Sequence, residues 1–278
     1  MSTGEAVIRV RGLETRFGKT VIHKDVNLDA YRGEILAIIG TSGGGKTTLL
    51  HEIVGLRRPT AGTVEVLGFD IHRLGWKEKH LLRKRWGMLF QQGALFTALD
   101  VFDNVAFPLR ELRTMGERVI EDLVRDLVML KLEMTGLKVE DAGKHPAELS
   151  GGMVKRAALA RALAVEAELL FLDEPGSGLD PVTARDLDSL LGELHRELGL
   201  TVVMVSHDLE SVAALADRVA VLADGSILFE GPLAELPDSK AAEHPAIKQL
   251  LEGPRGAALR ERVQEQTGDS QWKTAPTH

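Results

Sequence analysis

The chain of 278 residues contains no cysteine, which excludes disulfide bonds and thiolate chemistry. No apolar run approaches the roughly 20 residues that a membrane-spanning helix requires. The first residues, Met1-Ser-Thr-Gly-Glu-Ala6, lack the basic region and the apolar region of a secretory signal. These absences predict a protein that neither crosses a membrane nor is secreted.

Charge and apolar content set the next limits. The chain has 34 basic and 41 acidic residues, and its formal charge of -7 favours solubility and argues against broad binding of nucleic acid. Hydrophobic residues make up 44% of the sequence, which is ample for a packed core in one large domain or two small ones. An ordinary globular protein is therefore expected.

Short runs rich in β-branched residues predict strands along most of the chain. They lie at residues 7–10, 21–28, 35–39, 63–67, 87–90, 169–172, 201–205, 218–222 and 226–229. The runs at 35–39, 169–172 and 202–205 are apolar throughout, as expected for parallel strands that are covered on both faces. Helical patterns lie between several of them, so the sequence predicts a three-layer α/β core.

One region departs from this alternation. Over about residues 95–150 the strand signal disappears, and apolar residues recur at three- and four-residue steps at Val119, Leu123, Leu127 and Leu130. This spacing places them on one face of a helix. We therefore predict a helical insertion in the α/β core.

The sequence becomes polar after Pro237. A short helix is predicted near Ala246–Leu251 and a charged one near residues 257–266, and the last dozen residues are predicted to be disordered. We therefore expect a main domain over residues 1–240 and a C-terminal extension over residues 241–278.

The most specific motif is Gly40-Thr-Ser-Gly-Gly-Gly-Lys-Thr47, which fits the pattern GxxxxGK followed by Ser or Thr. Its glycines let backbone N–H groups turn toward an anion, the following helix adds its positive dipole end, and Lys46 supplies a cation for the β- and γ-phosphates. Thr47 is expected to hold Mg²⁺ through its hydroxyl. The residues predicted to bind nucleotide here are Gly40, Ser42, Gly43, Gly44, Gly45, Lys46, Thr47 and Thr48. The chain is therefore predicted to bind a nucleoside triphosphate.

A second motif, Leu169-Leu-Phe-Leu-Asp173-Glu174, is an apolar strand that ends in two carboxylates. Ligands of open α/β sheets bind at this end of the strands. Asp173 is expected to hold Mg²⁺ through water, and Glu174 to polarise the attacking water. Such carboxylates can also be turn formers, but in a chain with a phosphate-binding loop they predict hydrolysis of ATP. Because ATP is supplied in the cytoplasm, we expect the protein to act there.

A second glycine-rich helix start occurs at Leu149-Ser-Gly-Gly-Met153. Ser150 and the N–H groups of Gly151 and Gly152 form either another anion site or a plain N-cap. In a chain with only one phosphate-binding loop, the simplest use of the second site is to cap the nucleotide held by another copy. We therefore expect an active homodimer.

These motifs, with Ser177-Gly-Leu-Asp180 and Ser206-His207-Asp208, resemble the ATP-binding-cassette ATPase family in order and spacing over roughly Val7 to Gly231. The resemblance implies a P-loop NTPase core of the RecA-like type, with an antiparallel β subdomain and a helical insertion. It therefore also implies that ATP and Mg²⁺ are the cofactors.

The resemblance also implies roles for single residues. Ser150 and Gly152 match the signature that touches the γ-phosphate across the dimer, and Asp180 matches the loop that couples the two sites. His207 matches the switch histidine that orients the γ-phosphate and water. Without the resemblance, a histidine after a strand is more often a core or turn residue.

Two further residues match functional positions of the family, and each match has an alternative interpretation. Gln91 matches the glutamine that senses Mg²⁺ and links the core to the helical insertion, with Gln92 as the other possible register. Phe17 matches the aromatic that stacks on adenine, where the family more usually has tyrosine. The alternative for Phe17 is a core phenylalanine in a strand.

The segment Gln91–Glu111, QQGALFTALDVFDNVAFPLRE, carries three phenylalanines and indicates either a groove for a partner's helix or plain core. With the signature helix, it resembles the Mla-type ATPases of the MCE phospholipid transporters. The resemblance implies a homodimer beneath two permease subunits at the cytoplasmic face of the bacterial inner membrane. It further implies an MCE-domain lipid-binding protein, a possible STAS-domain protein, and glycerophospholipid moving between inner and outer membranes.

Other functions remain as alternatives. The nearest is the ATPase of an importer for amino acids or another solute, because the catalytic motifs are shared. A soluble cassette acting on nucleic acid or ribosomes would need a long coiled coil or a second cassette, neither of which the sequence contains, so no nucleic-acid partner is expected. The segment His244–Gly253 resembles the start of an extension that clasps the dimer, which gives the tail a hypothetical role.

Overall fold

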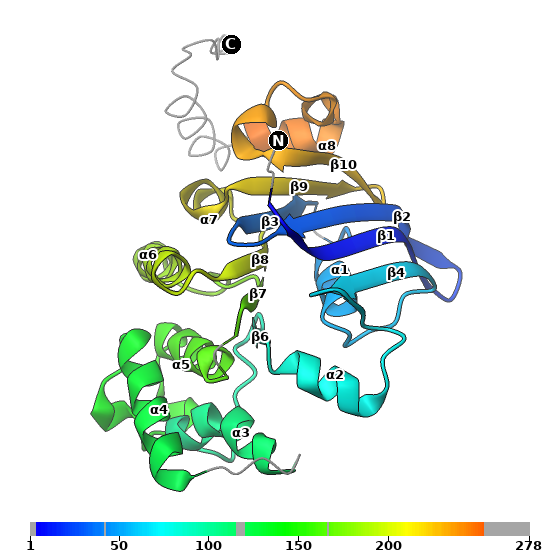
Figure 1. Cartoon of the computed structure of the whole chain (residues 1–278). Coiled ribbons are helices and arrows are strands. Elements are labelled where there is room, and N and C mark those ends of the chain that lie inside the picture. Colours follow the sequence, from blue (N-terminus) through cyan, green and yellow to red (C-terminus); the bar gives the residue numbers. More distant parts are fainter. Residues whose placement is uncertain (1–3, 42, 115–119, 166, 253–278) are drawn as a thin grey trace. The chain divides into compact units, whose positions relative to one another are not determined.

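The computed structural model describes residues 4–41, 43–114, 120–165 and 167–252. The chain divides into two compact units, whose path Figure 1 follows in colour. The first unit takes the ranges Met1–Glu5, Tyr31–Gly33 and Phe69–Met204, and the second takes Ala6–Ala30, Glu34–Gly68 and Val205–His278. In the described part of the chain, no helix combines the length and the apolar character that a bilayer crossing needs.

The second unit contains an antiparallel ribbon. β1 (Ala6–Phe17) pairs with β4 (Ala61–Val66), with Ile8 opposite Val66 and Val10 opposite Val64, and β2 (Thr20–Tyr31) lies on the other side of β1. These four apolar side chains are buried, because alternate residues of a strand face the same side. The predicted antiparallel β subdomain is present.

The same unit holds three further strands. β9 (Arg218–Ala223) lies between β3 (Ile35–Gly40), which is parallel to it, and β10 (Ser226–Pro232), which is antiparallel. β3 is buried along its whole length, as its unbroken apolar sequence predicts. Its helices are α1 (Lys46–Ile53), α7 (Leu209–Leu215), η3 (Leu233–Glu235), η4 (Lys240–Glu243) and α8 (Pro245–Glu252).

α8 confirms the helix predicted near residues 246–251. The helix predicted near residues 257–266 and the disorder predicted for the last dozen residues both fall outside the described residues.

The first unit is built on parallel strands. β7 (Leu169–Asp173) lies between β6 (Trp86–Leu89) and β8 (Thr201–Val205), and the pairing of β6 with β7 is parallel. α6 (Pro181–Leu198) connects β7 to β8, and both strands are fully buried. Two short elements, β5 (Phe69–Asp70) and α2 (Trp76–Arg83), precede β6.

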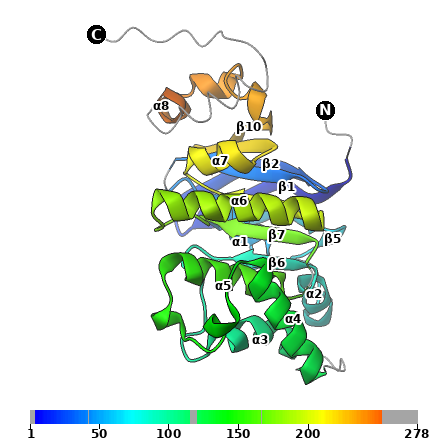
Figure 2. The same ribbon diagram turned by 90° about the vertical axis from the view of Figure 1, so that its left-hand side faces the viewer.

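The predicted helical insertion is part of this unit. α3 (Val101–Thr114), α4 (Glu121–Met134) and α5 (Gly151–Leu163) lie side by side, as the green helices of Figures 1 and 2 show. The 3-10 turns η1 (Val139–Asp141) and η2 (Pro146–Glu148) lead from α4 to α5. The helices share a core that includes Val105, Val128 and Ala160.

The apolar residues predicted on one helix face are not equally buried in α4, where Leu127 packs against the helical core. Leu123 and Leu130 are 54% and 49% exposed, and Val119 lies outside the described residues. The buried face instead carries Val124, Val128 and Leu132. α4 has two adjacent apolar stripes, and packing against α3 and α5 rather than the sequence period decides which one is buried.

Candidate active site

The second unit places a glycine loop between β3 and α1. A side chain at Gly40 would put its Cβ 2.0 Å from the carbonyl oxygen of Leu222, so only glycine fits where β3 ends. Gly45 has a φ of 94°, and a Cβ there would lie 2.6 Å from Nε2 of His23. The loop geometry is therefore possible only with glycine at these two positions.

The N-terminus of α1 is prepared for an anion. Its N-cap, Gly45, makes no side-chain capping bond, and the first turn contains no acidic residue. Thr47 and Thr48 lie in that first turn, and Ser42 lies outside the described residues. The helix start thus has no carboxylate of its own to oppose the positive end of its dipole, and a phosphate is favoured there.

Lys46 begins α1 and is buried. Its Nζ donates hydrogen bonds to the carbonyl oxygens of Gly40 and Thr41, at 3.1 and 2.9 Å. The ammonium group is therefore held over the loop by backbone oxygens, in the same loop as the glycines that form the predicted phosphate cradle.

Phe17 is the last residue of β1. Its side chain is 39% exposed, and the guanidinium carbon of Arg57 lies 4.3 Å from the centre of its ring. The alternative that made Phe17 a core residue is therefore wrong. An exposed ring is available for stacking, and its contact with adenine stays a prediction.

His207 lies in the second unit, in the loop between β8 and α7. The N–H of Ser206 donates to the carbonyl of Ile38 at 3.3 Å, and Asp208 caps α7 by accepting from the N–H of Glu210 at 2.9 Å. The loop is thus fixed on both sides of a half-buried histidine.

The first unit brings the predicted carboxylates and Gln91 to the ends of neighbouring parallel strands. Asp173 ends β7 and is buried, and Gln91 follows β6, with its Nε2 3.4 Å from Oγ of Ser177. Glu174 has a φ of 50°, in the left-handed region. Such strain in a non-glycine residue is concentrated at functional sites, which fits a catalytic carboxylate at this position.

Lys155, on α5, was not singled out by the sequence. Its buried Nζ donates to the carbonyl oxygen of Gln91 and, at 3.2 Å, to that of Glu174. Burial lowers the pKa of Lys155, against the opposing charges of Asp173 and Glu174. The available signal was a lysine within an otherwise alanine-rich, buried helix, where an unpaired ammonium would be costly.

The second glycine-rich helix start is also in the first unit. Ser150 caps α5, because its Oγ accepts from the N–H of Met153 at 3.3 Å. A Cβ at Gly152 would lie 2.6 Å from Cγ2 of Thr183, so a larger residue here would require the Thr183 side chain to move. The plain N-cap interpretation of Ser150 is therefore correct as far as this chain alone is concerned, and contact with a second copy's nucleotide stays a prediction.

Asp180 caps α6. Its carboxylate accepts from the hydroxyl of Thr183 at 2.6 Å and from the N–H groups of Val182 and Thr183 at 3.1 Å. These hydrogen bonds, led by the one from the Thr183 hydroxyl, lower the pKa of Asp180. The residue therefore has a structural role in this chain, beside the coupling role that the family resemblance implies.

The predicted ligands for Mg²⁺ are all oxygen donors: the hydroxyl of Thr47, the amide of Gln91 and the carboxylate of Asp173. Oxygen ligands are those that Mg²⁺ prefers, and the ion usually keeps several waters and binds substrate phosphates besides. Among the described residues there is no group of three or more His, Asp or Glu side chains that could enclose a metal. Each of the three residues therefore has the type of donor atom that Mg²⁺ accepts, and a shared ion stays a prediction.

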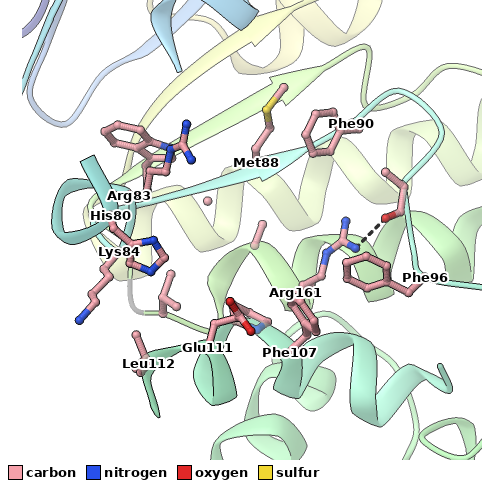
Figure 3. Close-up of a pocket in the computed structure, with 16 residues that line it drawn as sticks. His80, Arg83, Lys84, Met88, Phe90, Phe96, Phe107, Glu111, Leu112 and Arg161 are labelled. Carbon is pink, nitrogen blue, oxygen red and sulfur yellow. Dashed lines mark hydrogen bonds between the residues drawn. The ribbon is translucent and has the colours of Figure 1, made fainter. Parts of the chain in front are cut away.

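The first unit also contains an open groove of about 380 Å³ (Figure 3). The rings of Phe96 and Phe107 lie 4.7 Å apart along it, with 44% and 39% of the side chains exposed, and Met88 and Phe90 add apolar surface. Phe102 packs against the helical core instead. Two of the three phenylalanines therefore line a groove and the third is core, and a partner's helix in that groove stays a prediction.

Charged side chains border this groove. Figure 3 places Arg83, Lys84 and His80 at one end and Arg161 beside Phe96. Arg161 donates to the carbonyl oxygens of residues 93 and 94, both at 2.7 Å, so its guanidinium braces the loop that carries Phe96. Burial lowers the pKa of Arg161. The groove is thus apolar along its length and predominantly basic at its edges.

The chain is similar to a known protein family and to individual proteins. The family model described as "ABC transporter" matches residues 23–177. The "Intermembrane phospholipid transport system ATP-binding protein MlaF" of Haemophilus influenzae is 43% identical over 254 residues, which cover 91% of this chain and 93% of the relative. The "Probable ribonucleotide transport ATP-binding protein mkl" of Mycobacterium leprae is 39% identical over 248 residues, 89% of this chain and 69% of that protein.

A solved structure is similar as well. The dimeric, post-hydrolysis ATP-binding cassette MJ0796, bound to ADP and Pi, superposes with a TM-score of 0.73 at 31% identity, covering 81% of this chain and 98% of that one. Its similarity confirms the predicted fold class.

Proposed function

Because this chain belongs to the ABC transporter family, we propose that it is the ATP-hydrolysing subunit of a phospholipid transporter that works between two membranes through separate permease subunits. The chain is an ABC-type ATPase. The cargo rests on one observation, the 43% identity over 91% of the chain with a protein of an intermembrane phospholipid transport system. The groove with Phe96 and Phe107 supports a separate permease as partner.

The residues of both units have distinct tasks in the proposed ATPase cycle. Lys46 and the N–H groups of the glycine loop bind the phosphates of ATP. Thr47, Gln91 and Asp173 are the proposed ligands of Mg²⁺, which when bound neutralises charge on the phosphates. These oxygen donors hold the ion at the nucleotide and not in a protein cage.

Hydrolysis itself falls to two further side chains. Glu174 takes a proton from the attacking water at its carboxylate, and His207 orients that water and the γ-phosphate. Lys155 holds the backbone carbonyl of Glu174, which keeps the strained residue in one conformation. Phe17 supplies a stacking surface for adenine.

We propose a homodimer as the active form. Ser150, Gly151 and Gly152 at the start of α5 meet the nucleotide of the second copy, and Asp180 couples the two sites. Support comes from the dimeric state of the similar cassette and from the exposure of Ser150 and Gly151 in this chain.

The groove is the proposed dock for a permease helix. Exchanging Phe96 and Phe107 for serine removes apolar surface that a docked helix would cover, so the chain should lose co-purification with its permease and keep nucleotide binding. The matched control is Leu130→Ser, because Leu130 is at least as exposed as the two phenylalanines but lies on α4, outside the groove. Equal loss with both variants would remove the docking proposal.

The remaining partners and the location follow from the same resemblance. We propose two permease subunits, an MCE-domain lipid-binding protein and a STAS-domain protein around the ATPase dimer, at the cytoplasmic face of an inner membrane. We also propose that the extension beyond residue 240 clasps the dimer. Deleting residues 254–278 tests this, because unchanged dimerisation and transport would exclude the clasp.

The test of the cargo is purification of the chain from its native membranes in mild detergent, with mass spectrometry of the proteins and lipids that accompany it. A permease, an MCE-domain protein and bound phospholipid support the proposal. Co-purification of a solute-binding protein, or transport of ribonucleotide or amino acid by the purified complex, would leave the ATPase assignment intact but show that the cargo is not phospholipid. Absence of any membrane partner would favour a soluble cassette.

A further inference from the structure

Three polar side chains meet in the core of the second unit, directly behind the phosphate-binding loop. His23 of β2 lies between Thr15 of β1 and Glu52 of α1, three elements that Figure 1 draws in blue. His23 and Glu52 have no exposed side-chain surface, and Thr15 is 2% exposed. Ionisable side chains are rarely buried so completely unless they are paired.

The distances link this cluster to the loop. Nδ1 of His23 is 2.9 Å from Oγ1 of Thr15 and 3.2 Å from Oε2 of Glu52, and Thr15 donates its hydroxyl hydrogen to Oε1 of Glu52 at 2.7 Å. On the other side of the ring, Nε2 is 3.1 Å from the carbonyl oxygen of Gly45.

The partners of the ring decide its protonation. A carbonyl oxygen only accepts hydrogen bonds, so Nε2 must carry a hydrogen to bond to Gly45. With Glu52 ionised, the Thr15 hydroxyl donates to Oε1, and Oγ1 of Thr15 then accepts from Nδ1. With both ring nitrogens protonated and Glu52 ionised, every short contact joins a donor to an acceptor. In a neutral pair, depending on which way the Thr15 hydroxyl points, either Oγ1 of Thr15 or Oε2 of Glu52 faces an unprotonated Nδ1 with no hydrogen between them.

We propose that His23 is a buried imidazolium, paired with the Glu52 carboxylate, that positions the phosphate-binding loop through the carbonyl of Gly45. It is a positioning residue, because it touches the loop's backbone and not the nucleotide. The inference extends the proposed function, since it rests on this loop being the one that binds ATP.

The peptide between Gly45 and Lys46 explains how the imidazolium acts on the loop. Its carbonyl accepts from His23 and also from the N–H of Leu49 at 2.8 Å. Because the peptide is planar and trans, fixing the carbonyl on the core side turns the N–H of Lys46 to the opposite side. A charged donor on the carbonyl also polarises that peptide, so its N–H becomes a stronger donor to phosphate. The missing Cβ of Gly45 is what lets His23 approach.

The protonation state is the first test, and it needs no variant. The ring nitrogens of His23 are assigned by through-bond ¹⁵N NMR in the wild-type, nucleotide-free protein at neutral pH. We expect hydrogen on both Nδ1 and Nε2. A ring with hydrogen on one nitrogen only would overturn the charge pair.

The second test separates positioning from structure. In the double variant His23→Leu/Glu52→Leu, apolar side chains replace the buried pair, an exchange that commonly leaves stability unchanged or higher. The hydrogen bond to Gly45 is lost, so we expect the KM for ATP to rise about 10- to 100-fold, as for loss of a hydrogen bond from a charged donor, with a smaller change in kcat. An unchanged KM in a folded double variant would overturn the positioning role.

Two controls complete the design. His195→Gln removes another histidine that bonds to a backbone carbonyl, that of Leu200 at 2.8 Å, and should leave the KM for ATP unchanged. If the wild-type chain bound no ATP, the proposed function would fail, whereas the NMR measurement would still decide the charge pair. If the double variant did not fold, Thr15→Val, which removes the hydroxyl that contacts His23 and Glu52 but keeps both charges, must still raise the KM; no change there would contradict the proposal.

Discussion

The chain contains two glycine-rich helix starts, and they are built differently. At α1 the N-cap is Gly45, which makes no side-chain capping bond, and Lys46 lies buried over the loop. At α5 the N-cap is Ser150, whose Oγ already accepts from Met153, and the first glycine is exposed. At the start of α1 no side chain caps the backbone N–H donors, which remain available to a ligand, and Lys46 adds a positive charge. At the start of α5, the side chain of Ser150 already accepts a hydrogen bond from one of these N–H groups.

This difference separates a primary phosphate site from a secondary one. The α1 start is further supported from behind by the His23 and Glu52 pair, whereas the α5 start is followed by Lys155, which supports the catalytic carboxylate rather than the glycines. We infer that the α1 loop binds ATP without help and that the α5 start contributes only when a second copy brings a nucleotide to it.

The largest effect is expected from Lys46→Ala, which removes the only charged side chain of the α1 loop. Without this cation the phosphates lose a charge-assisted contact that acts in ground and transition states, so kcat/KM should fall by about 10³-fold. Steady-state ATPase assays measure it. The control is Lys77→Ala on the exposed face of α2, which should leave kcat/KM unchanged. A similar loss of kcat/KM in this control would mean that the change in net charge, and not the loss of the loop's cation, causes the effect.

The second-largest effect is expected from Glu174→Gln, which should lower kcat without weakening ATP binding. Removing the proposed general base lowers kcat by about 10²- to 10⁴-fold. The amide is nearly the same size, so ATP binding and ATP-driven dimerisation should persist, which gel filtration with and without ATP measures. Full ATPase activity would exclude Glu174 as the base.

Ser150→Ala sharpens the contrast between the two helix starts. The isolated chain should bind ATP as tightly as before, whereas kcat should fall by about 10-fold, because only the dimeric site is weakened. Loss of the N-cap should also lower the free energy of unfolding by about 1 kcal/mol. Ser239→Ala, whose hydroxyl bonds to Leu236, controls for a general loss of stability. Weaker ATP binding by the isolated chain would contradict the division of roles.

The smallest effect concerns Asp180 and pH. Hydrogen bonds from Thr183 lower the pKa of Asp180 in the folded chain, so the unfolded chain binds a proton first as pH falls. The stabilisation is complete above the unfolded value of about 3.9 and is lost as pH falls through the lower folded value. Urea unfolding should therefore show wild type more stable than Asp180→Ala at neutral pH, with the difference shrinking below about pH 4. A difference that is constant with pH would contradict this.

Local motifs were predictable from the sequence because their chemistry depends on consecutive residues. The strand, glycine loop and helix around Lys46, and the strand that ends at Asp173, are formed by neighbours in the chain, and the structure has both. Glu174 and Gln91 also lie where the strand order predicts them, at the ends of β7 and β6.

Features that depend on packing between distant segments were not predictable. Lys155 and His23 gain their roles from carbonyl groups 19 to 64 positions away along the chain, which no spacing reveals. On α4 the sequence offered two apolar stripes, and the neighbouring helices selected the one with Val124 and Val128.

The most direct test of the two-copy site is to mix Lys46→Ala chains with Ser150→Ala chains and measure ATP hydrolysis. In a mixed dimer, the intact loop of the Ser150→Ala chain faces the intact α5 start of the Lys46→Ala chain, so one complete site is restored. We predict activity well above the sum of the two variants measured separately. Activity equal to that sum would mean that both helix starts must come from one chain, which contradicts the account.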